Sequence, residues 1–117
     1  MSNENPSPLP NDFEKALVNF VGSMNVMLAQ KNTKLSEKNP AMADYYKPVE
    51  LEHGTKNIRV VFTSNSQRHV HCFIDKTTGS ILKPAGWKAP AKGVRGSIYK
   101  PETYAHADAY GGWLYRR

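Results

Sequence analysis

The chain has little of several features that define common protein classes. Cysteine occurs once, at Cys72, so no disulfide can form within the chain, as is usual in a reducing compartment. No run of about 18 apolar residues is present, which argues against a membrane-spanning helix. Residues 1–10 contain no basic, apolar signal segment. These absences predict a cytoplasmic protein that has no membrane partner.

Catalytic and cofactor-binding motifs are also missing. The 117 residues are too few for a Rossmann enzyme or a barrel, and neither of the common glycine-rich phosphate-binding motifs occurs. Residues 92–97 resemble such a loop only loosely and lack the flanking strand and helix that it needs. We therefore expect a protein that is not an enzyme and uses no cofactor and no metal ion.

Acidic residues are scarce in the second half of the chain. Residues 1–55 carry five basic and seven acidic groups, whereas residues 56–117 carry eleven basic and three acidic ones, for a net charge of +6. Between Lys83 and Lys100 there are five basic residues and no acid. This asymmetry is typical of proteins that bind an acidic partner such as nucleic acid or an anionic membrane, although a solvated basic surface has the same pattern.

One amphipathic helix dominates the first half. Residues 1–10 are polar and rich in proline, which predicts a flexible arm. Asn11 then provides an N-cap, with Glu14 three positions later. Apolar residues recur at three- and four-residue spacing to about Lys31, and the polar residues 31–38 predict a loop or a frayed extension of the helix.

The helix also has apolar side chains away from this stripe. Val18 and Met27 indicate either a second buried face that meets another subunit or one wide core face. Hydrophobic residues make up only 39% of the chain, so the core of one subunit is small. We therefore expect a homo-oligomer, either a dimer or a tetramer.

The centre of the chain predicts an antiparallel sheet. β-Branched and aromatic residues gather in stretches separated by turn residues, namely 48–52 as an edge strand, then 58–63, 68–75 and 80–83. Beyond Pro84, glycine and proline recur, and we expect no further regular structure. The predicted fold is α+β: a long N-terminal helix packed on an antiparallel β-meander of three or more strands. A basic aromatic loop and tail complete one domain over residues 11–117.

Strand alternation divides the side chains of residues 68–75 between two faces. Val70, Cys72 and Ile74 are expected on one face, and His69, His71, Phe73 and Asp75 on the other. Only two histidines then converge, which is too few for a structural zinc site. Cys72 lacks the neighbouring base that a nucleophile requires. A nuclease that uses His71 with Asp75 stays open.

One segment combines spaced cations with large aromatic side chains. It contains Lys83, Trp87, Lys88, Lys92, Arg95, Tyr99 and Lys100 among glycines and prolines. Single-stranded nucleic acid needs this mixture, because phosphates attract cations while unstacked bases stack on aromatic faces. Arg59 and Arg68 extend the predicted DNA-binding set onto the sheet, together with Phe62 and Phe73. The alternative is that Trp87 and Tyr99 are core or edge-covering aromatics.

The second half resembles a block found in small phage proteins. The likeness runs through Val70–Lys76 and Gly79, then Ile81–Lys83, then Gly86-Trp87-Lys88-Ala89-Pro90-Ala91-Lys92 with Arg95 and Gly96, and less closely through Tyr110–Arg116. Over residues 57–117 the chain is similar to the single-stranded-DNA-binding RNA polymerase cofactors (Drc) of certain short-tailed phages. The resemblance implies a fold other than the OB-fold, binding to melted promoter DNA, and recruitment of a phage RNA polymerase in the host-cell cytoplasm.

The sequence therefore predicts non-catalytic binding of single-stranded DNA. Three alternatives stay open. A phage virion or assembly protein would share the small mixed fold and the free cysteine, and a protein that binds a host factor would use the Tyr/Trp tail as its anchor. The third alternative is a small His-dependent nuclease.

Overall fold

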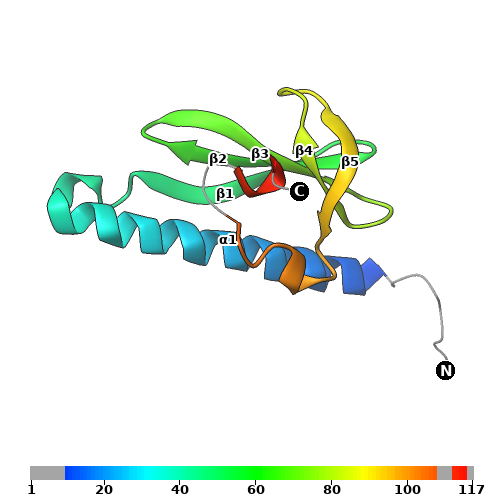
Figure 1. Ribbon diagram of the computed structural model, residues 1–117, viewed down its shortest axis with the longest axis horizontal. Coiled ribbons are helices and arrows are strands. Elements are labelled where there is room, and N and C mark those ends of the chain that lie inside the picture. The colour runs from blue at the N-terminus through cyan, green and yellow to red at the C-terminus, as the bar shows by residue number, and fades with distance from the viewer. Residues whose placement is uncertain (1–9, 108–111, 116–117) are drawn as a thin grey trace.

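One long helix and an open five-stranded sheet form the fold. The computed structural model describes residues 10–107 and 112–115. Helix α1 (Pro10–Lys38) precedes the strands, which are β1 (Tyr46–His53), β2 (Asn57–Ser64), β3 (Gln67–Asp75), β4 (Ser80–Pro84) and β5 (Pro90–Ser97). Short 3-10 helices occur at η1 (Pro40–Met42), η2 (Pro101–Thr103) and η3 (Gly112–Tyr115). The strands are antiparallel and follow chain order in the sheet, and α1 runs along it (Figure 1). The α+β prediction is confirmed.

Helix α1 is longer than the sequence analysis predicts. It begins at Pro10, one residue before the predicted N-cap Asn11, because proline is favoured at the first helical position. It continues through residues 31–38, so of the two alternatives for this segment the extension of the helix is confirmed and the loop is wrong. The helix ends before Asn39 because the residue preceding a proline is disfavoured in the helical region. Of the predicted arm 1–10, only Pro10 lies within the described residues.

The core lies between α1 and the sheet face that is turned toward it, which we call the inner face. Leu17, Phe20, Met24 and Leu28 are buried at three- and four-residue spacing on α1. The strands contribute Ile58, Val60, Cys72, Ile74 and Ile81, all fully buried. Tyr104 packs edge-on against Phe20 with ring centroids 4.9 Å apart. Among the described residues, no helix is long and apolar enough to cross a membrane.

Two asparagines of α1 hold the edge strand β1 in place. Asn32 donates from Nδ2 to the Tyr46 carbonyl and accepts from the Tyr46 N–H, both at 2.8 Å. Asn25 accepts from the Val49 N–H at 2.9 Å. The bonds to Tyr46 lie just before the irregularity between Lys47 and Glu50, and the bond to Val49 lies within it, where the pairing of β1 with β2 is interrupted. Side chains of α1 therefore make some of the backbone hydrogen bonds that a neighbouring strand would make. Asn32 lies in the polar part of α1, so its bonds to β1 explain why this part is helical.

The predicted strands are confirmed, with small extensions at their ends. The turn after β2 contains Asn65 and Ser66 with φ of 51° and 70°, as a two-residue hairpin turn requires. Gly79 has φ of 75°, and a Cβ there would lie 2.5 Å from the Tyr99 ring, so this turn requires glycine. The expectation of no regular structure beyond Pro84 is wrong, because β5 completes the sheet. The register between β4 and β5 shifts twice between Ile81 and Pro84, and these bulges allow the glycine-containing β5 to pair with β4.

A β-bulge in β3 changes which side chains face the core. Val60 pairs with Cys72, but Val61 pairs with Val70, so His71 is an extra residue on β3. His71 is buried and stacks on Trp113 with centroids 6.0 Å apart, and His69 stacks on the inward-facing Phe62 at 5.0 Å.

The alternation of faces predicted for residues 68–75 is therefore wrong for the residues that precede Cys72. His69 and His71 lie on the inner face together with Cys72, whereas Val70 lies on the outer face with its partner Val61. Phe73 and Asp75 are on the outer face, beyond the bulge, with Arg59 and Asn57 as their partners.

The C-terminal aromatic segment belongs to the core. Trp113 and Leu114 are buried in the cluster that contains Phe20 and Ile81. Figure 1 shows η3 (red) beside the sheet, on the side of the strands that faces the viewer. Trp113 Nε1 donates to His71 Nε2 at 3.3 Å. Trp113 is therefore a packing residue, so it does not provide the exposed anchor that the host-factor alternative requires.

Replacing Trp113 by phenylalanine should destabilise the protein by about 1–3 kcal/mol, because a buried acceptor on His71 loses its donor while the aromatic bulk is largely kept. Urea unfolding measures the change. The matched control, Trp87→Phe, alters a half-exposed indole and should shift stability by less than about 0.5 kcal/mol. Equal stability of both variants would contradict the structural role of the Trp113–His71 bond.

Val18 and Met27, the two residues that suggested a second apolar face on α1, do not form one surface in the structure. Met27 packs against the core, whereas Val18 is 68% and Val26 57% exposed. Nine residues separate Val18 from Met27, about two and a half helical turns, so they cannot share a face. Val18, Gly22 and Val26 do share one.

Val18→Asp combined with Val26→Lys should convert an oligomer into a smaller species in light scattering, because both changes place charge on the stripe. A control pair, Lys34→Asp with Glu37→Lys, alters charge elsewhere on α1 and should leave the mass unchanged. A wild-type protein that is monomeric at micromolar concentration would refute the expectation.

Candidate nucleic-acid interface

The face of the sheet opposite α1, which we call the outer face, has a small aromatic and arginine-rich cluster. Arg59 of β2 pairs with Phe73 of β3, and its guanidinium carbon lies 5.9 Å from the Phe73 ring centre. Phe73 is 3% exposed, and the neighbouring Val61 is fully buried, although neither belongs to the core under α1. Something other than the helix therefore covers this face.

The cover is the loop between β4 and β5, which carries Trp87. The Arg59 Nε donates to the Trp87 carbonyl at 2.8 Å and so ties the loop to β2. The guanidinium carbons of Arg59 and Arg68 lie 5.2 and 5.5 Å from the Trp87 ring centre, which is cation–π distance. Trp87 stays 40% exposed. We call Arg59, Arg68, Phe73 and Trp87 the outer cluster.

The structure thus brings together three of the predicted DNA-binding residues, Arg59, Arg68 and Trp87. Sequence reasoning missed the acidic residues that accompany them. Glu52 accepts from Arg59 at 2.5 Å and from Arg68 at 2.7 Å, and Glu50 accepts from Arg68 at 3.0 Å. Hydrogen bonds from Arg68 and then Arg59 lower the pKa of Glu52, and Glu52 raises the pKa of Arg68. Glu50 and Glu52 stand two residues apart on β1, a spacing that places both on one face.

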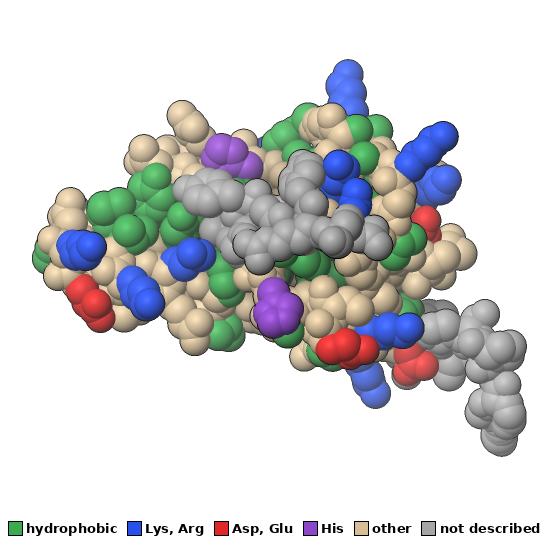
Figure 2. All heavy atoms as spheres, in the orientation of Figure 1, with side chains coloured by type: hydrophobic (Ala, Val, Ile, Leu, Met, Phe, Trp, Pro, Cys, Tyr) green, Lys and Arg blue, Asp and Glu red, His purple; other side chains and the backbone are tan. Residues whose placement is uncertain are grey.

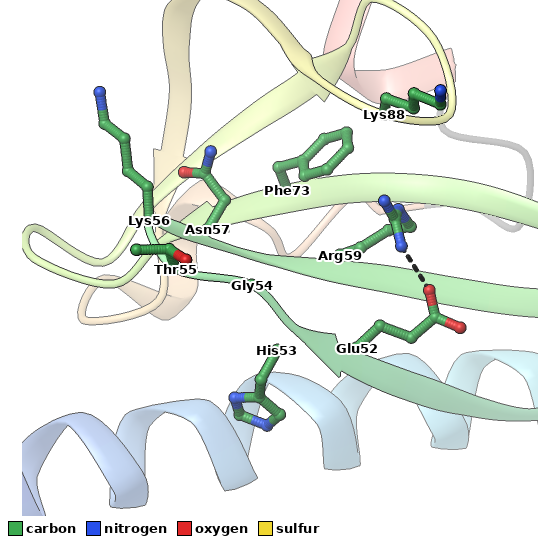
Figure 3. Close-up of a pocket in the computed structure, with 9 residues that line it drawn as sticks. All are labelled: Glu52, His53, Gly54, Thr55, Lys56, Asn57, Arg59, Phe73 and Lys88. Carbon is green, nitrogen blue, oxygen red and sulfur yellow. Dashed lines mark hydrogen bonds and ion pairs between the residues drawn. The ribbon is translucent and has the colours of Figure 1, made fainter.

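A hollow of about 220 Å³ lies beside the outer cluster. It is lined by Glu52, His53, Gly54, Thr55, Lys56, Asn57, Arg59, Phe73 and Lys88. Figure 3 shows Arg59 and Phe73 rising from adjacent strands beneath the loop that carries Lys88, with Lys56 on the opposite side of the hollow. Among the described residues, the ion pairs involve neither Lys56 nor Lys88.

The other predicted contact residues are distributed over several surfaces. Lys83 and Arg95 are partly buried, whereas Lys92 and Lys100 are exposed. Tyr99 packs on the core near the start of α1, edge-on to Phe13 at 6.5 Å, and burial followed by the charge of Asp12 raises its pKa. Tyr99 thus packs on the core and away from the outer cluster, as the alternative of a packing aromatic has it, and its assignment to the DNA-binding set stays a prediction.

The cationic side chains also form more than one group. Figure 2 shows Lys and Arg side chains gathered over the C-terminal half of α1 as well as near the β4–β5 hairpin. Lys31 and Lys34 of α1 line a shallow depression with Leu35 and Tyr46. The sequence analysis placed the basic excess only in the second half of the chain.

The side chains considered for metal or nucleophilic chemistry lie apart from one another in the described part of the chain. Within residues 10–107 and 112–115, no group of three or more metal-ligating side chains converges. Burial raises the pKa of the Cys72 thiol, which keeps the thiol protonated and unreactive. His71 faces the core, while Asp75 lies on the outer face and accepts from the backbone N–H groups of Thr77 and Thr78. The pair proposed for a nuclease does not meet.

Comparisons with known proteins give a family but no described activity. No curated protein and no solved structure matches the chain significantly. The likeness to phage single-stranded-DNA-binding proteins therefore stays a prediction. A family profile does match, and it covers residues 8–116, nearly the whole chain. The chain belongs to this family, the family of unknown function DUF7717.

Proposed function

We propose that the protein binds single-stranded DNA, without catalysis, through the outer face of its sheet. The observation that carries the proposal is a half-exposed indole, Trp87, held against two guanidinium groups at a surface that also presents Lys56 and Lys88. Single strands are bound by such combinations of a stacking surface and nearby cations. The resemblance extends the proposal to melted promoter DNA and to a phage RNA polymerase as partner.

The arrangement favours stacking because Trp87 is already held in place. Its carbonyl is bonded to Arg59, and its ring lies near both arginines. Little conformational entropy is then lost when a base stacks on the exposed part of the ring. A base within a duplex is stacked on both sides and cannot reach the indole, so the surface favours single strands.

The charges divide into two groups with different roles. Glu50 and Glu52 already bind Arg59 and Arg68, so these arginines mainly support the indole and are partly neutralised. Phosphate binding then depends on the lysines, namely Lys56 and Lys88 at the hollow and the exposed Lys92 on β5. Contacts between such lysines and phosphates weaken steeply with salt.

Trp87→Leu should lower affinity for an unstructured single strand by about five- to hundredfold, which corresponds to about 1–3 kcal/mol for one base stack. Affinity for duplex should change little. Fluorescence anisotropy with labelled strands measures both, and Trp87→Phe, which keeps a flat ring, should retain most of the binding. Parallel losses for both nucleic acids together with a lower melting temperature would show that Trp87 only stabilises the fold.

Lys88→Gln combined with Lys92→Gln should flatten the salt dependence of single-strand binding by about 1.4 in the log–log slope, or about 0.7 for each phosphate contact. The matched control is Lys34→Gln with Lys38→Gln, which removes the same charge from α1. If the control pair flattens the slope more than the test pair does, the strand binds along α1 and not on the outer face.

A further inference from the structure

The hollow beside the outer cluster contains an amide oxygen that has no partner. Asn57 begins β2, and its Oδ1 is buried without a hydrogen bond from the described residues. Buried polar atoms of this kind are nearly always paired, because leaving one without a partner is unfavourable. Asn57 lines the hollow (Figure 3), and a rotation of its amide turns the covered Oδ1 toward a molecule that enters, which can then supply the missing donor.

The walls of the hollow suit a flat ring. Its volume of about 220 Å³ far exceeds the roughly 30 Å³ that one water occupies in the liquid. Arg59 contributes a planar guanidinium, which Glu52 and the Trp87 carbonyl hold in a fixed orientation. Nucleobases stack on such planes as they do on aromatic rings. Phe73 adds an apolar wall beneath.

The two lysines at the hollow match the charge of a nucleic-acid backbone. Lys56 and Lys88 lie on opposite sides of it (Figure 3) and are exposed. Each nucleotide within a strand has a phosphate on both sides of its sugar. Lys76, by contrast, donates to the Gly54 carbonyl at 2.8 Å and so helps to hold the adjacent turn.

We propose that this hollow seats one unstacked base of the bound strand. The Asn57 amide rotates so that its Oδ1 accepts a hydrogen bond from the base edge, Arg59 stacks on the ring, and Lys56 and Lys88 bind the phosphates on either side. Each of the four bases has at least one N–H donor on an accessible edge, so the subsite needs no particular sequence. This inference rests on the proposed function, and it places a second base contact next to Trp87.

The test compares two single strands of about 12 nucleotides, a length within the usual site sizes, by fluorescence anisotropy. One is oligothymidine and the other has the same backbone with abasic residues throughout. Asn57→Leu, which keeps the side-chain size, should weaken oligothymidine binding by about three- to tenfold and leave the abasic strand unaffected. Asn57→Ala should give the same pattern. Lys56→Gln should weaken both strands equally, because it removes a phosphate contact.

Gln67→Leu is the matched control, since it removes an amide at the other end of the sheet, where β2 pairs with β3 through Ser64 and Gln67. It should leave both affinities unchanged. Equal losses for both strands with Asn57→Leu, or no loss, would overturn the base subsite while oligothymidine binding and the Trp87→Leu effect remain. If the wild-type protein binds neither strand, the proposed function itself fails.

Discussion

The bulge at His71 is the constraint on which both faces of the sheet depend. With an extra residue in β3, Val60 pairs with Cys72 while Val61 pairs with Val70. Regular alternation would have turned Arg68 toward α1, where a charged group would be buried at a large energetic cost. The bulge instead places Arg68 beside Trp87 and puts His71 under Trp113. One inserted residue thus brings His71 into the core on the inner face and Arg68 into the outer cluster on the other face.

The two faces of the sheet are covered in different ways. The inner face is covered by α1 and by Trp113, so its apolar side chains are buried. Among the residues that the structure describes, the outer face is covered by the β4–β5 loop and by arginine side chains, of which Arg59 lies over Phe73 while the charged ends stay near water. Such a cover leaves aromatic surface and a hollow accessible, which is why the proposed binding surface lies there.

The local features of the fold follow from short-range sequence patterns, and the errors come from tertiary contacts. The periodicity of Phe20 and Met24 predicts α1, and alternation predicts β2 to β4. The extension of α1 depends on Asn32 bonding to Tyr46, which lies far along the chain and leaves no local signal. The bulge at His71 and the packing of Tyr99 are likewise set by partners remote in sequence. The spacing of Trp87 and the lysines did predict part of the candidate site, but Asn57 and the pairing of Glu52 with both arginines needed the folded arrangement.

The edge of the sheet at β1 has a further consequence for assembly. Pro48 has no N–H to offer, and the backbone groups of Tyr46 and Val49 are bonded to side chains of α1. Over residues 46–49 an incoming strand finds few available donors, so edge-to-edge addition and the aggregation that follows from it are suppressed along this part of the edge. The asparagines that bind β1 therefore also hinder the addition of another strand at this position.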